Sequence, residues 1–389
     1  MPREVEHLNA RSKDLFRERT DRLRRPDVPL YVVTALLLAF GVVMVYSASS
    51  YNAEMNYGSK YFFMIKQIFG VVGGAAAMTA MTLLDYRKLM KVRYVILAVC
   101  AVLLVLVLIP GVGIANYGAR RWLNLGVMTL QASEVAKVGF VIFAAAYMYK
   151  RGDKMTTVRG WLPLAAVGGV LCFLIMLEPS MSVTMCLALV MLTMLVMGGM
   201  RVIHMLFILV PLVGLAVVLI LVEPYRLARL FAFLDPWASP LEEGYQLLQS
   251  YYALGSGGLF GVGLYGSRQK YLFLPFSESD FIFSVIGEEL GLIGCTIVMC
   301  AFAFMIWRLV RIAKSAADRF GTYLSGGMAA LIGIQVAINV AVVSGCIPPT
   351  GIPLPFVSSG SSALVVFCGG IGICQSVRLR SHVSVLALV

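Results

Sequence analysis

The chain carries little charge for its length. Only 13% of its 389 residues are Asp, Glu, Lys or Arg, whereas 60% are hydrophobic, and soluble domains carry about 25% charged residues. Apolar runs of about 18 residues or more recur along the chain, and a helix needs roughly 20 such residues to cross a bilayer. A soluble globular fold is therefore excluded, and we expect an all-α polytopic membrane protein.

Several common catalytic and binding motifs are also missing. The three histidines, His7, His204 and His382, are scattered, so they predict neither a zinc site nor a Ser-His-Asp triad. The eight cysteines form no Cys-x-x-Cys pair and lie nearly all in apolar runs, as packing residues do. There is no Walker sequence, and the glycine pattern from Gly261 to Gly266 follows no predicted strand. Neither ATP hydrolysis nor dinucleotide binding is expected.

Apolar segments divide the chain into about ten predicted transmembrane helices. The segments are 29–48, 61–83, 93–110, 133–149, 161–177, 181–198, 202–222, 281–307, 321–344 and 361–377. They form a membrane domain at 29–380, flanked by a basic N-terminal tail at 1–28 and a C-terminal tail at 381–389. One long loop, 223–280, separates spans seven and eight.

The basic residues predict the orientation of these spans. If the N-terminus is cytoplasmic, 23 of the 32 Lys and Arg residues fall on the cytoplasmic side and seven fall on the outer side. By the positive-inside rule, both termini are then cytoplasmic and the loop 223–280 is extracytoplasmic. The net charge of +12 is explained by this topology and by contact with inner-leaflet lipids, so no nucleic-acid partner is expected.

Acidic residues at the start of the eighth span are candidates for catalysis. Asp280 directly precedes the apolar segment 281–283, where desolvation would raise the pKa of its carboxyl group and make it a usable general base. The same position suits a helix N-cap, and both interpretations stay open on the residues alone. Glu288 and Glu289 lie two turns into the span, so at least one should face a cavity or a polar partner.

Two other spans begin or end with charged residues. Glu134 and Lys137 lie one helical turn apart on one face, and Ser133 before them suits an N-cap. The pair is either a structural salt bridge or a site where Lys137 holds an anionic substrate group that Glu134 helps to orient. Lys66, near the outer end of the second span, either extends its ammonium group to the interface or contacts substrate.

Ordered sequence blocks cover most of the membrane domain. They are Asn116 to Trp122, Gln131 to Glu134 with Lys137, Phe233 to Trp237, Gly244 to Gln246, Gln269 to Tyr271, Asp280 to Phe283, Gly287 to Gly291, Gln335 with Asn339, and Thr350 to Phe356. In these blocks the chain resembles the SEDS family (shape, elongation, division and sporulation proteins), which includes FtsW, RodA and SpoVE. The glycine-rich loop and the Gly287 to Gly291 block are closer to FtsW and SpoVE than to RodA.

The chain departs from the usual family pattern at a few positions. Ala132 stands where the family usually has Pro, Ser180 where it usually has Asp, and Phe276 where it commonly has Glu. Residues 358–362 also differ from the common Ser-Tyr-Gly-Gly-Ser-Ser sequence. These changes remove two acidic side chains from the expected outer cavity and leave Asp280 in place.

The resemblance implies an inverting peptidoglycan glycosyltransferase that polymerises lipid II at the outer face of the bacterial cytoplasmic membrane, for cell division or sporulation. Asp280 would deprotonate the acceptor 4-hydroxyl group, while basic residues and a divalent cation, Mg²⁺ or Mn²⁺, would neutralise the departing pyrophosphate. The implied substrate-binding residues are Lys66, Arg120, Arg121, Gln131, Ser133, Glu134, Lys137, Gln269, Lys270 and Glu288. The implied partners are a class B penicillin-binding protein with transpeptidase activity, membrane lipids, and the divisome or related cell-wall machinery.

Three alternatives to a division or sporulation polymerase remain from the sequence. They are a RodA-like elongation polymerase, a lipid II flippase, and a scaffold for the division machinery. A flippase needs a hydrophilic path through both leaflets, whereas the charged residues of this chain gather toward the outer one. A scaffold would not explain why costly polar residues converge there. The enzyme is therefore the favoured interpretation.

Overall fold

The computed structural model describes residues 25–116, 119–124, 129–222 and 224–381. Most of the predicted N-terminal tail and nearly all of the C-terminal tail lie outside the described residues, as does part of the block from Asn116 to Trp122. The tail boundaries therefore stay predictions.

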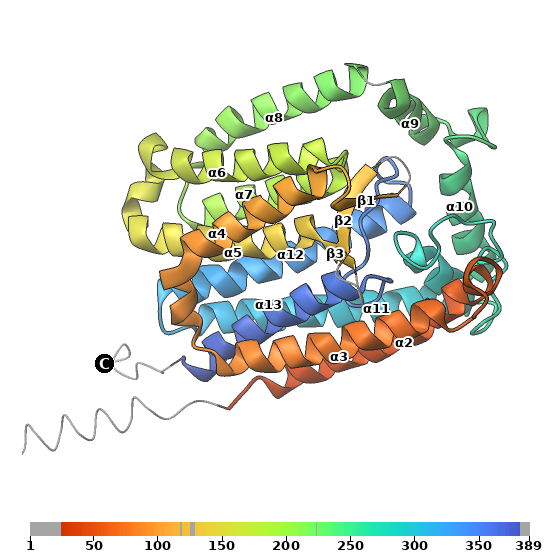
Figure 1. Cartoon of the computed structure of the whole chain (residues 1–389), viewed down its shortest axis with the longest axis horizontal. Coiled ribbons are helices and arrows are strands. Elements are labelled where there is room, and N and C mark those ends of the chain that lie inside the picture. The colour runs from red at the N-terminus through yellow and green to blue at the C-terminus, as the bar shows by residue number, and fades with distance from the viewer. Residues whose placement is uncertain (1–24, 117–118, 125–128, 223, 382–389) are drawn as a thin grey trace, which may run out of the picture.

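Long, roughly antiparallel helices form the body of the molecule (Figure 1). They are α2 (Val28–Tyr57), α3 (Phe62–Leu83), α4 (Tyr86–Leu108), α5 (Ala132–Arg151), α6 (Val158–Leu177), α7 (Met181–Met197), α8 (Val202–Val222), α11 (Ile282–Lys314), α12 (Arg319–Val343) and α13 (Ser361–Leu379). Each overlaps one predicted span. Among the described residues, eight helices are long and apolar enough to cross a membrane, while α7 and the apolar segment Val202–Pro211 of α8 are shorter. The polytopic helical fold is confirmed, and the count of ten spans stays a prediction.

Shorter elements connect the helices. Between α4 and α5 lies an antiparallel sheet of β1 (Gly113–Asn116), β2 (Ala119–Asn124) and β3 (Thr129–Gln131), in that order. A 3₁₀ turn, η1 (Gly152–Thr156), follows α5. The long loop holds α9 (Pro224–Leu234), η2 (Pro236–Ala238) and α10 (Tyr245–Gly257). The sheet and these loop helices were not predicted, and they surround one end of the bundle (Figure 1).

The membrane helices α5 and α13 are more deeply buried in the bundle than α12. In an 18-residue apolar stretch of each helix, 83% of the residues are buried in α5 and 17% in α3, which faces outward. Glycines let the outer helix α3 pack closely on α13, since a Cβ at Gly70 would lie 2.8 Å from Ser361 and one at Gly74 would lie 2.9 Å from Cys368. This packing leaves the outer face of α3 free for lipid.

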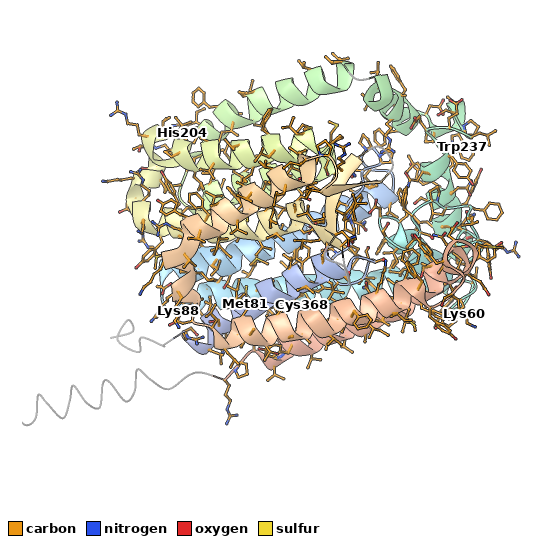
Figure 2. All side chains as sticks on the ribbon, viewed as in Figure 1. Lys60, Met81, Lys88, His204, Trp237 and Cys368 are labelled. Carbon is orange, nitrogen blue, oxygen red and sulfur yellow. The ribbon has the colours of Figure 1, made fainter. Side chains whose placement is uncertain are left out.

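The two ends of the bundle differ in character. Lys60 and Trp237 mark one end, and Lys88 and His204 mark the other (Figure 2). At the second end, Asp27 caps α2 by accepting a hydrogen bond from Leu30 and forms a partly buried ion pair with Arg308 of α11. Gln375 of α13 accepts a hydrogen bond from the backbone nitrogen of Asp27 at 2.9 Å and donates one to its backbone oxygen at 2.8 Å. Helices α2, α11 and α13 are thereby joined at this end.

Candidate active site

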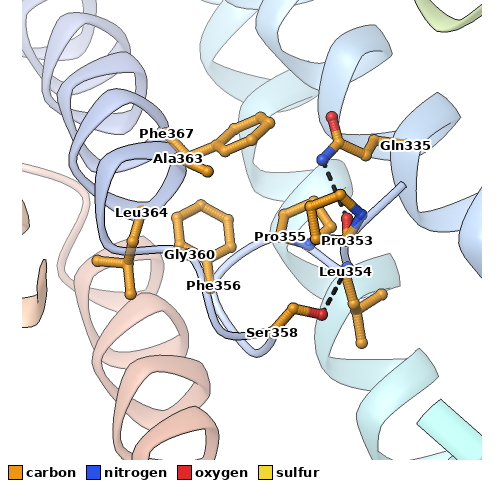
Figure 3. Close-up of a pocket in the computed structure, with 10 residues that line it drawn as sticks. All are labelled: Gln335, Pro353, Leu354, Pro355, Phe356, Ser358, Gly360, Ala363, Leu364 and Phe367. Carbon is orange, nitrogen blue, oxygen red and sulfur yellow. Dashed lines mark hydrogen bonds between the residues drawn. The ribbon is translucent and has the colours of Figure 1, made fainter. Parts of the chain in front are cut away.

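The segment between α12 and α13 is fixed by two amides on one face of α12. Asn339 donates through Nδ2 to the backbone oxygens of Asp280 and Ile352, at 2.8 and 2.7 Å. Gln335, one turn away, donates to the backbone oxygen of Pro353 at 3.0 Å (Figure 3). Because an unmade buried hydrogen bond is costly, these amides hold residues 352 and 353 close to Asp280, which lies two residues before the start of α11.

A serine then joins this segment to the end of the long loop. Ser358 donates from Oγ to the backbone oxygen of Ser279 at 2.6 Å and accepts from the backbone nitrogen of Leu354 at 2.8 Å. The small pocket behind it is lined mostly by apolar side chains, and neither Asp280 nor a basic residue lines it (Figure 3). We interpret that pocket as a packing gap and place the candidate site at Asp280, beside Gly351.

Asp280 is partly buried and lies beside the bare backbone of Gly351, where a Cβ would come within 2.8 Å of its Oδ2. The N-cap of α11 is Phe281, with no side-chain capping bond, so the structure does not support a capping role for Asp280. Burial raises the pKa of Asp280 to about 7, Arg121 and Arg229 act to lower it, and Glu278 acts to raise it. Its carboxyl group therefore titrates near neutral pH.

Two further carboxyl groups interact with Arg121 or with Asp280. Glu178, at the end of α6, is fully buried, and burial raises its pKa to about 8 while the charge of Arg121 opposes the rise. Arg121 donates to the backbone oxygens of Glu178 and Pro179, which holds β2 against the end of α6. Glu278 is also buried, and burial raises its pKa as well. The sequence had not singled out Glu178 or Arg229, although an acid that directly follows an apolar run is a signal of the kind that identified Asp280.

Glu134 and Lys137 form the predicted ion pair, at 2.8 Å, with both side chains fully buried. Lys137 also donates to Oε1 of Gln335, the residue that holds Pro353. The ion pair itself is confirmed, and both a purely structural role and a role in binding an anionic substrate group stay predictions. Ser133 is not an N-cap, because α5 begins one residue earlier, after Gln131.

Several buried polar atoms around Asp280 and Lys137 have no hydrogen-bond partner among the described residues. A bound polar ligand or water would satisfy them, because such groups are rarely left unpaired. The atoms are Oγ of Ser133, Oε2 of Glu134, both carboxyl oxygens of Glu178, Oδ1 of Asn339 and Oγ1 of Thr350.

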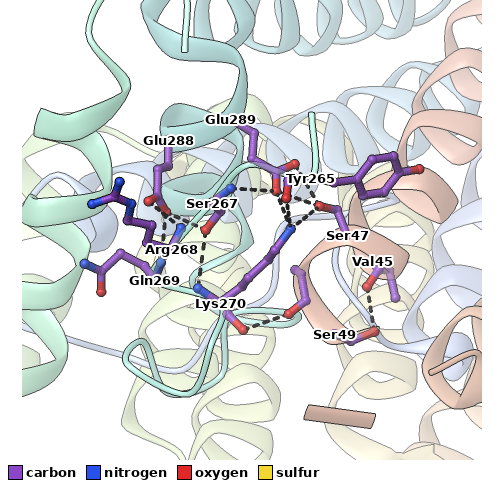
Figure 4. A network of polar contacts seen from close by, with 12 residues as sticks. Val45, Ser47, Ser49, Tyr265, Ser267, Arg268, Gln269, Lys270, Glu288 and Glu289 are labelled. Carbon is purple, nitrogen blue, oxygen red and sulfur yellow. Dashed lines mark hydrogen bonds and ion pairs between the residues drawn. The ribbon is translucent and has the colours of Figure 1, made fainter. Parts of the chain in front are cut away.

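Glu288 and Glu289 belong to a separate polar network (Figure 4). Glu288 accepts from Oγ of Ser267 and from the backbone nitrogens of Arg268 and Gln269, the latter two at 2.8 and 3.4 Å. The predicted need of these glutamates for polar partners is confirmed. Contact of Gln269 or Glu288 with substrate stays a prediction, because Glu288 is used here to hold a loop.

Glu289 continues the network toward α2. It pairs with the buried ammonium group of Lys270 at 3.0 Å and accepts from Oγ of Ser47 at 2.6 Å. Lys270 also donates to the backbone oxygen of Tyr265 at 2.8 Å. Contact of Lys270 with substrate likewise stays a prediction, since its ammonium group is fully engaged within the protein.

The remaining predicted site residues lie closer to the surface. Lys66 is exposed, with its Nζ atom 4.2 Å from the ring centre of Phe62, as the interfacial interpretation expects. Arg120 is exposed, whereas its neighbour Arg121 is turned toward α6. Gln131 donates its backbone nitrogen to Oγ of Ser362 at 3.3 Å. Of the two arginines, Arg121 is the one whose charge acts on Asp280.

Comparison with known proteins gives consistent matches over nearly the whole chain. The family profile FTSW_RODA_SPOVE, described as "Cell cycle protein", matches residues 28–382. Stage V sporulation protein E of Bacillus subtilis (strain 168) is 38% identical, over 93% of this chain and 100% of that protein. The "Probable peptidoglycan glycosyltransferase FtsW" of Trichlorobacter lovleyi is 39% identical, over 92% of this chain and 94% of that protein.

Two solved structures share the fold. One is a chain from a structure described as "Structural coordination of polymerization and crosslinking by a peptidoglycan synthase complex". It matches with a TM-score of 0.76 and 24% identity, over 91% of this chain and 98% of that one. The other is the rod shape determining protein RodA of Thermus thermophilus, with a TM-score of 0.66 and 24% identity over 92% of this chain and 98% of that one.

Proposed function

Because the chain belongs to the FtsW, RodA and SpoVE family of cell cycle proteins, we infer that it is a multi-pass membrane protein and a peptidoglycan glycosyltransferase. We propose further that it polymerises lipid II, a disaccharide-pentapeptide on undecaprenyl pyrophosphate, for division or sporulation. Asp280 supports this proposal, because its carboxyl group has a pKa of about 7 and lies where Arg121 and Arg229 act on it. A base and nearby cations are the groups that this transfer requires.

Asp280 acts as the general base in the proposed reaction. In its ionised form it takes the proton from the 4-hydroxyl group of the acceptor sugar, and the resulting oxygen nucleophile attacks the anomeric carbon of the donor. The bond from that carbon to the pyrophosphate breaks, and the configuration inverts. A base whose pKa lies near the working pH combines a large ionised fraction with sufficient basicity. Asn339 positions Asp280 through its backbone oxygen.

The arginines near Asp280 are the proposed site for the departing pyrophosphate. Arg121 is held against α6 by its backbone contacts, and Arg229 is held at the edge of the site by a hydrogen bond to the backbone oxygen of Pro349 at 3.4 Å. Guanidinium groups in fixed positions stabilise developing phosphate charge. We assign Lys137 a positioning role, since its ammonium group connects Glu134 to Gln335 inside the bundle.

A divalent cation, Mg²⁺ or Mn²⁺, stays a prediction. No group of three or more His, Cys, Asp and Glu side chains that could hold a metal ion occurs among the described residues. Such ions prefer oxygen ligands and commonly bind through substrate phosphates. A cation would therefore bind here together with the pyrophosphate of the substrate, whose charge it would help to neutralise.

The proposal includes a location and a partner. With both termini in the cytoplasm, Asp280 faces the outer side of the cytoplasmic membrane, where no nucleotide is needed because the pyrophosphate is the leaving group. A class B penicillin-binding protein is the proposed partner, since a transpeptidase would crosslink the strands that this enzyme makes. The divisome or related cell-wall machinery would bring the two together.

Polymerisation of purified lipid II tests the proposed function. Asp280→Asn keeps the size of the side chain but removes the base, so the yield of glycan polymer on a gel should fall by roughly 10²–10⁴-fold, with and without the partner. Asp235→Asn is the matched control, because Asp235 is an exposed acid of the same loop that caps η2, and Asn can also cap. Near-normal polymerisation by a folded Asp280→Asn protein would contradict the proposal.

A further inference from the structure

Helix α11 is interrupted part of the way along its length. Gly291 has φ 67° and ψ −167°, so the helical hydrogen-bond pattern breaks there. The loop after α10 fills the break with its own backbone. Four hydrogen bonds of 2.9 to 3.2 Å join them, namely Val262 to Glu288, Gly263 to Glu289, Leu292 to Gly258 and Ile293 to Leu259, each from backbone nitrogen to backbone oxygen. The segment 258–264 is therefore fixed to α11.

Glycines permit this close approach of two backbones. A Cβ at Gly257 would collide with the backbone of Gly287, and one at Gly261 with the backbone of Glu289. A Cβ at Gly291 would collide with Gly261 in turn. Gly261, the first glycine of the sequence that resembles a nucleotide-binding pattern, is thus explained by a helix-to-loop contact.

Two helices indicate the depth of this contact in the membrane. About 20 helical residues cross the hydrocarbon core. A stretch of that length, counted back along α11 from Trp307 at the basic end of the helix, ends at Glu288. A stretch of the same length, counted forward along α2 from its first residue, Val28, ends at Ser47. Ser47 and Glu289 are hydrogen-bonded to each other, so both counts place the outer boundary of the hydrocarbon at the same level. The segment 258–264 lies at that boundary.

The segment presents apolar side chains at this level. Leu259 and Phe260 are 60% and 80% exposed, and Val262 and Leu264 are also exposed. No charged residue occurs from 244 to 267. The exposed surface continues on α11 below the break, where Leu292 is exposed as well. In water such a patch would be costly, whereas lipid acyl chains would cover it without cost.

We propose that residues 258–264 insert into the outer leaflet as a rigid wedge, with phospholipid acyl chains as the occupant. Tyr265 follows directly and packs edge-on against Tyr46 of α2, as expected for tyrosines at a membrane interface. Arg268 is exposed just above, at the level of headgroup phosphates. The wedge holds the chain that leads to Asp280 at a constant height above the bilayer.

Site-directed spin labelling in nanodiscs tests the wedge without any activity assay. In a variant that lacks the native cysteines, a nitroxide at Phe260→Cys is compared with one at Ile297→Cys, which is exposed on α11 about 9 Å deeper. The aqueous control is Asn56→Cys, exposed on α2 about 13 Å beyond Ser47. Collision rates are measured with oxygen, which partitions into lipid, and with a nickel chelate, which stays in water.

The label at position 260 should collide several-fold more with oxygen than with the nickel chelate, as the label at 297 does and the label at 56 does not. A nickel accessibility equal to that of position 56 would overturn the proposal, because the segment would then be in water. Shielding from both reagents would also overturn it, since a protein surface, such as a second copy of the chain, would then cover the segment.

Discussion

At the residue scale, Asp280 shows how opposing effects set one pKa. Burial raises the pKa of its carboxyl group to about 7, against the attraction of Arg121 and Arg229 for the ionised form. Because the ionised form is the proposed base, kcat/KM for polymerisation should rise about tenfold per pH unit below pH 7 and level off above it. Activity rises with pH in this range because the pKa is raised. A carboxyl group with a raised pKa is protonated and inactive at pH values where an exposed Asp would be ionised.

A neighbouring pair of arginines provides a matched test of this electrostatic assignment. Arg121→Gln removes a charge that lowers the pKa of Asp280, so the pH of half-maximal kcat/KM should move upward whatever happens to the maximal rate. Arg120→Gln removes the same charge from an exposed position on the same strand and should leave that pH unchanged. Equal shifts in the two variants would show that Arg121 has no special relation to the base.

The residue types at the site were predictable, whereas their pairing was only partly so. The spacing of Glu134 and Lys137 predicted a salt bridge, because a helical turn is a local property. The attachment of Lys137 to Gln335, 198 positions away in sequence, could not be predicted. Arg229 and Glu178 were missed for the same reason, since their importance depends on burial and on groups far away in the chain.

At the element scale, apolar length predicted the long helices because a membrane span needs only its own backbone to satisfy its hydrogen bonds. The sheet from β1 to β3 was missed, because three strands of 4, 6 and 3 residues give a weak periodic signal. The break in α11 was missed as well. Gly291 is tolerated there because another segment supplies the hydrogen bonds, which is not a property of the helix sequence alone.

Two glycines on neighbouring elements should respond oppositely to alanine. Gly291→Ala adds a side chain at positive φ, where it meets the backbone of Leu259 and Gly261, so stability should fall by more than about 1 kcal/mol. Gly255→Ala lies on the exposed face of α10 with no atom within 4 Å of the new Cβ, and helix propensity should make it neutral or stabilising by up to about 1 kcal/mol.

Thermal unfolding of both glycine variants in nanodiscs, followed by circular dichroism, distinguishes these outcomes. The expected order of melting temperature is Gly255→Ala at or above the unmodified protein, and Gly291→Ala clearly below it. An unchanged melting temperature for Gly291→Ala would mean that the loop can leave α11 without cost, contrary to the four hydrogen bonds that join them.

At the scale of the whole molecule, the polar groups are sorted by level along the bundle. The pair of Asp27 and Arg308 lies at one end, and the network of Ser47 and Glu289 lies about 30 Å further along α2. Asp280 lies beyond that network, nine residues before Glu289 along the chain. Glu134 and Lys137 also lie toward one end of their helix, in the first two turns of α5, where they pair inside the bundle.

This sorting makes the orientation testable with one pair of sites. Asn56 lies near the end of α2, whose start at Asp27 is tied to Arg308, and Ala317 lies in the turn just after α11, next to the residue that pairs with Arg87. Both positions are exposed, and they lie at opposite ends of the bundle.

In a variant without native cysteines, Asn56→Cys should react with a membrane-impermeant maleimide in intact cells or spheroplasts. Ala317→Cys should react only after the membrane is permeabilised, which also shows that its thiol is reactive. We expect this orientation because Lys and Arg are in excess at the end of the bundle that holds Ala317. Labelling of Ala317→Cys in intact cells, with Asn56→Cys protected, would place Asp280 in the cytoplasm, and an enzyme facing that way could not extend the wall outside the cell.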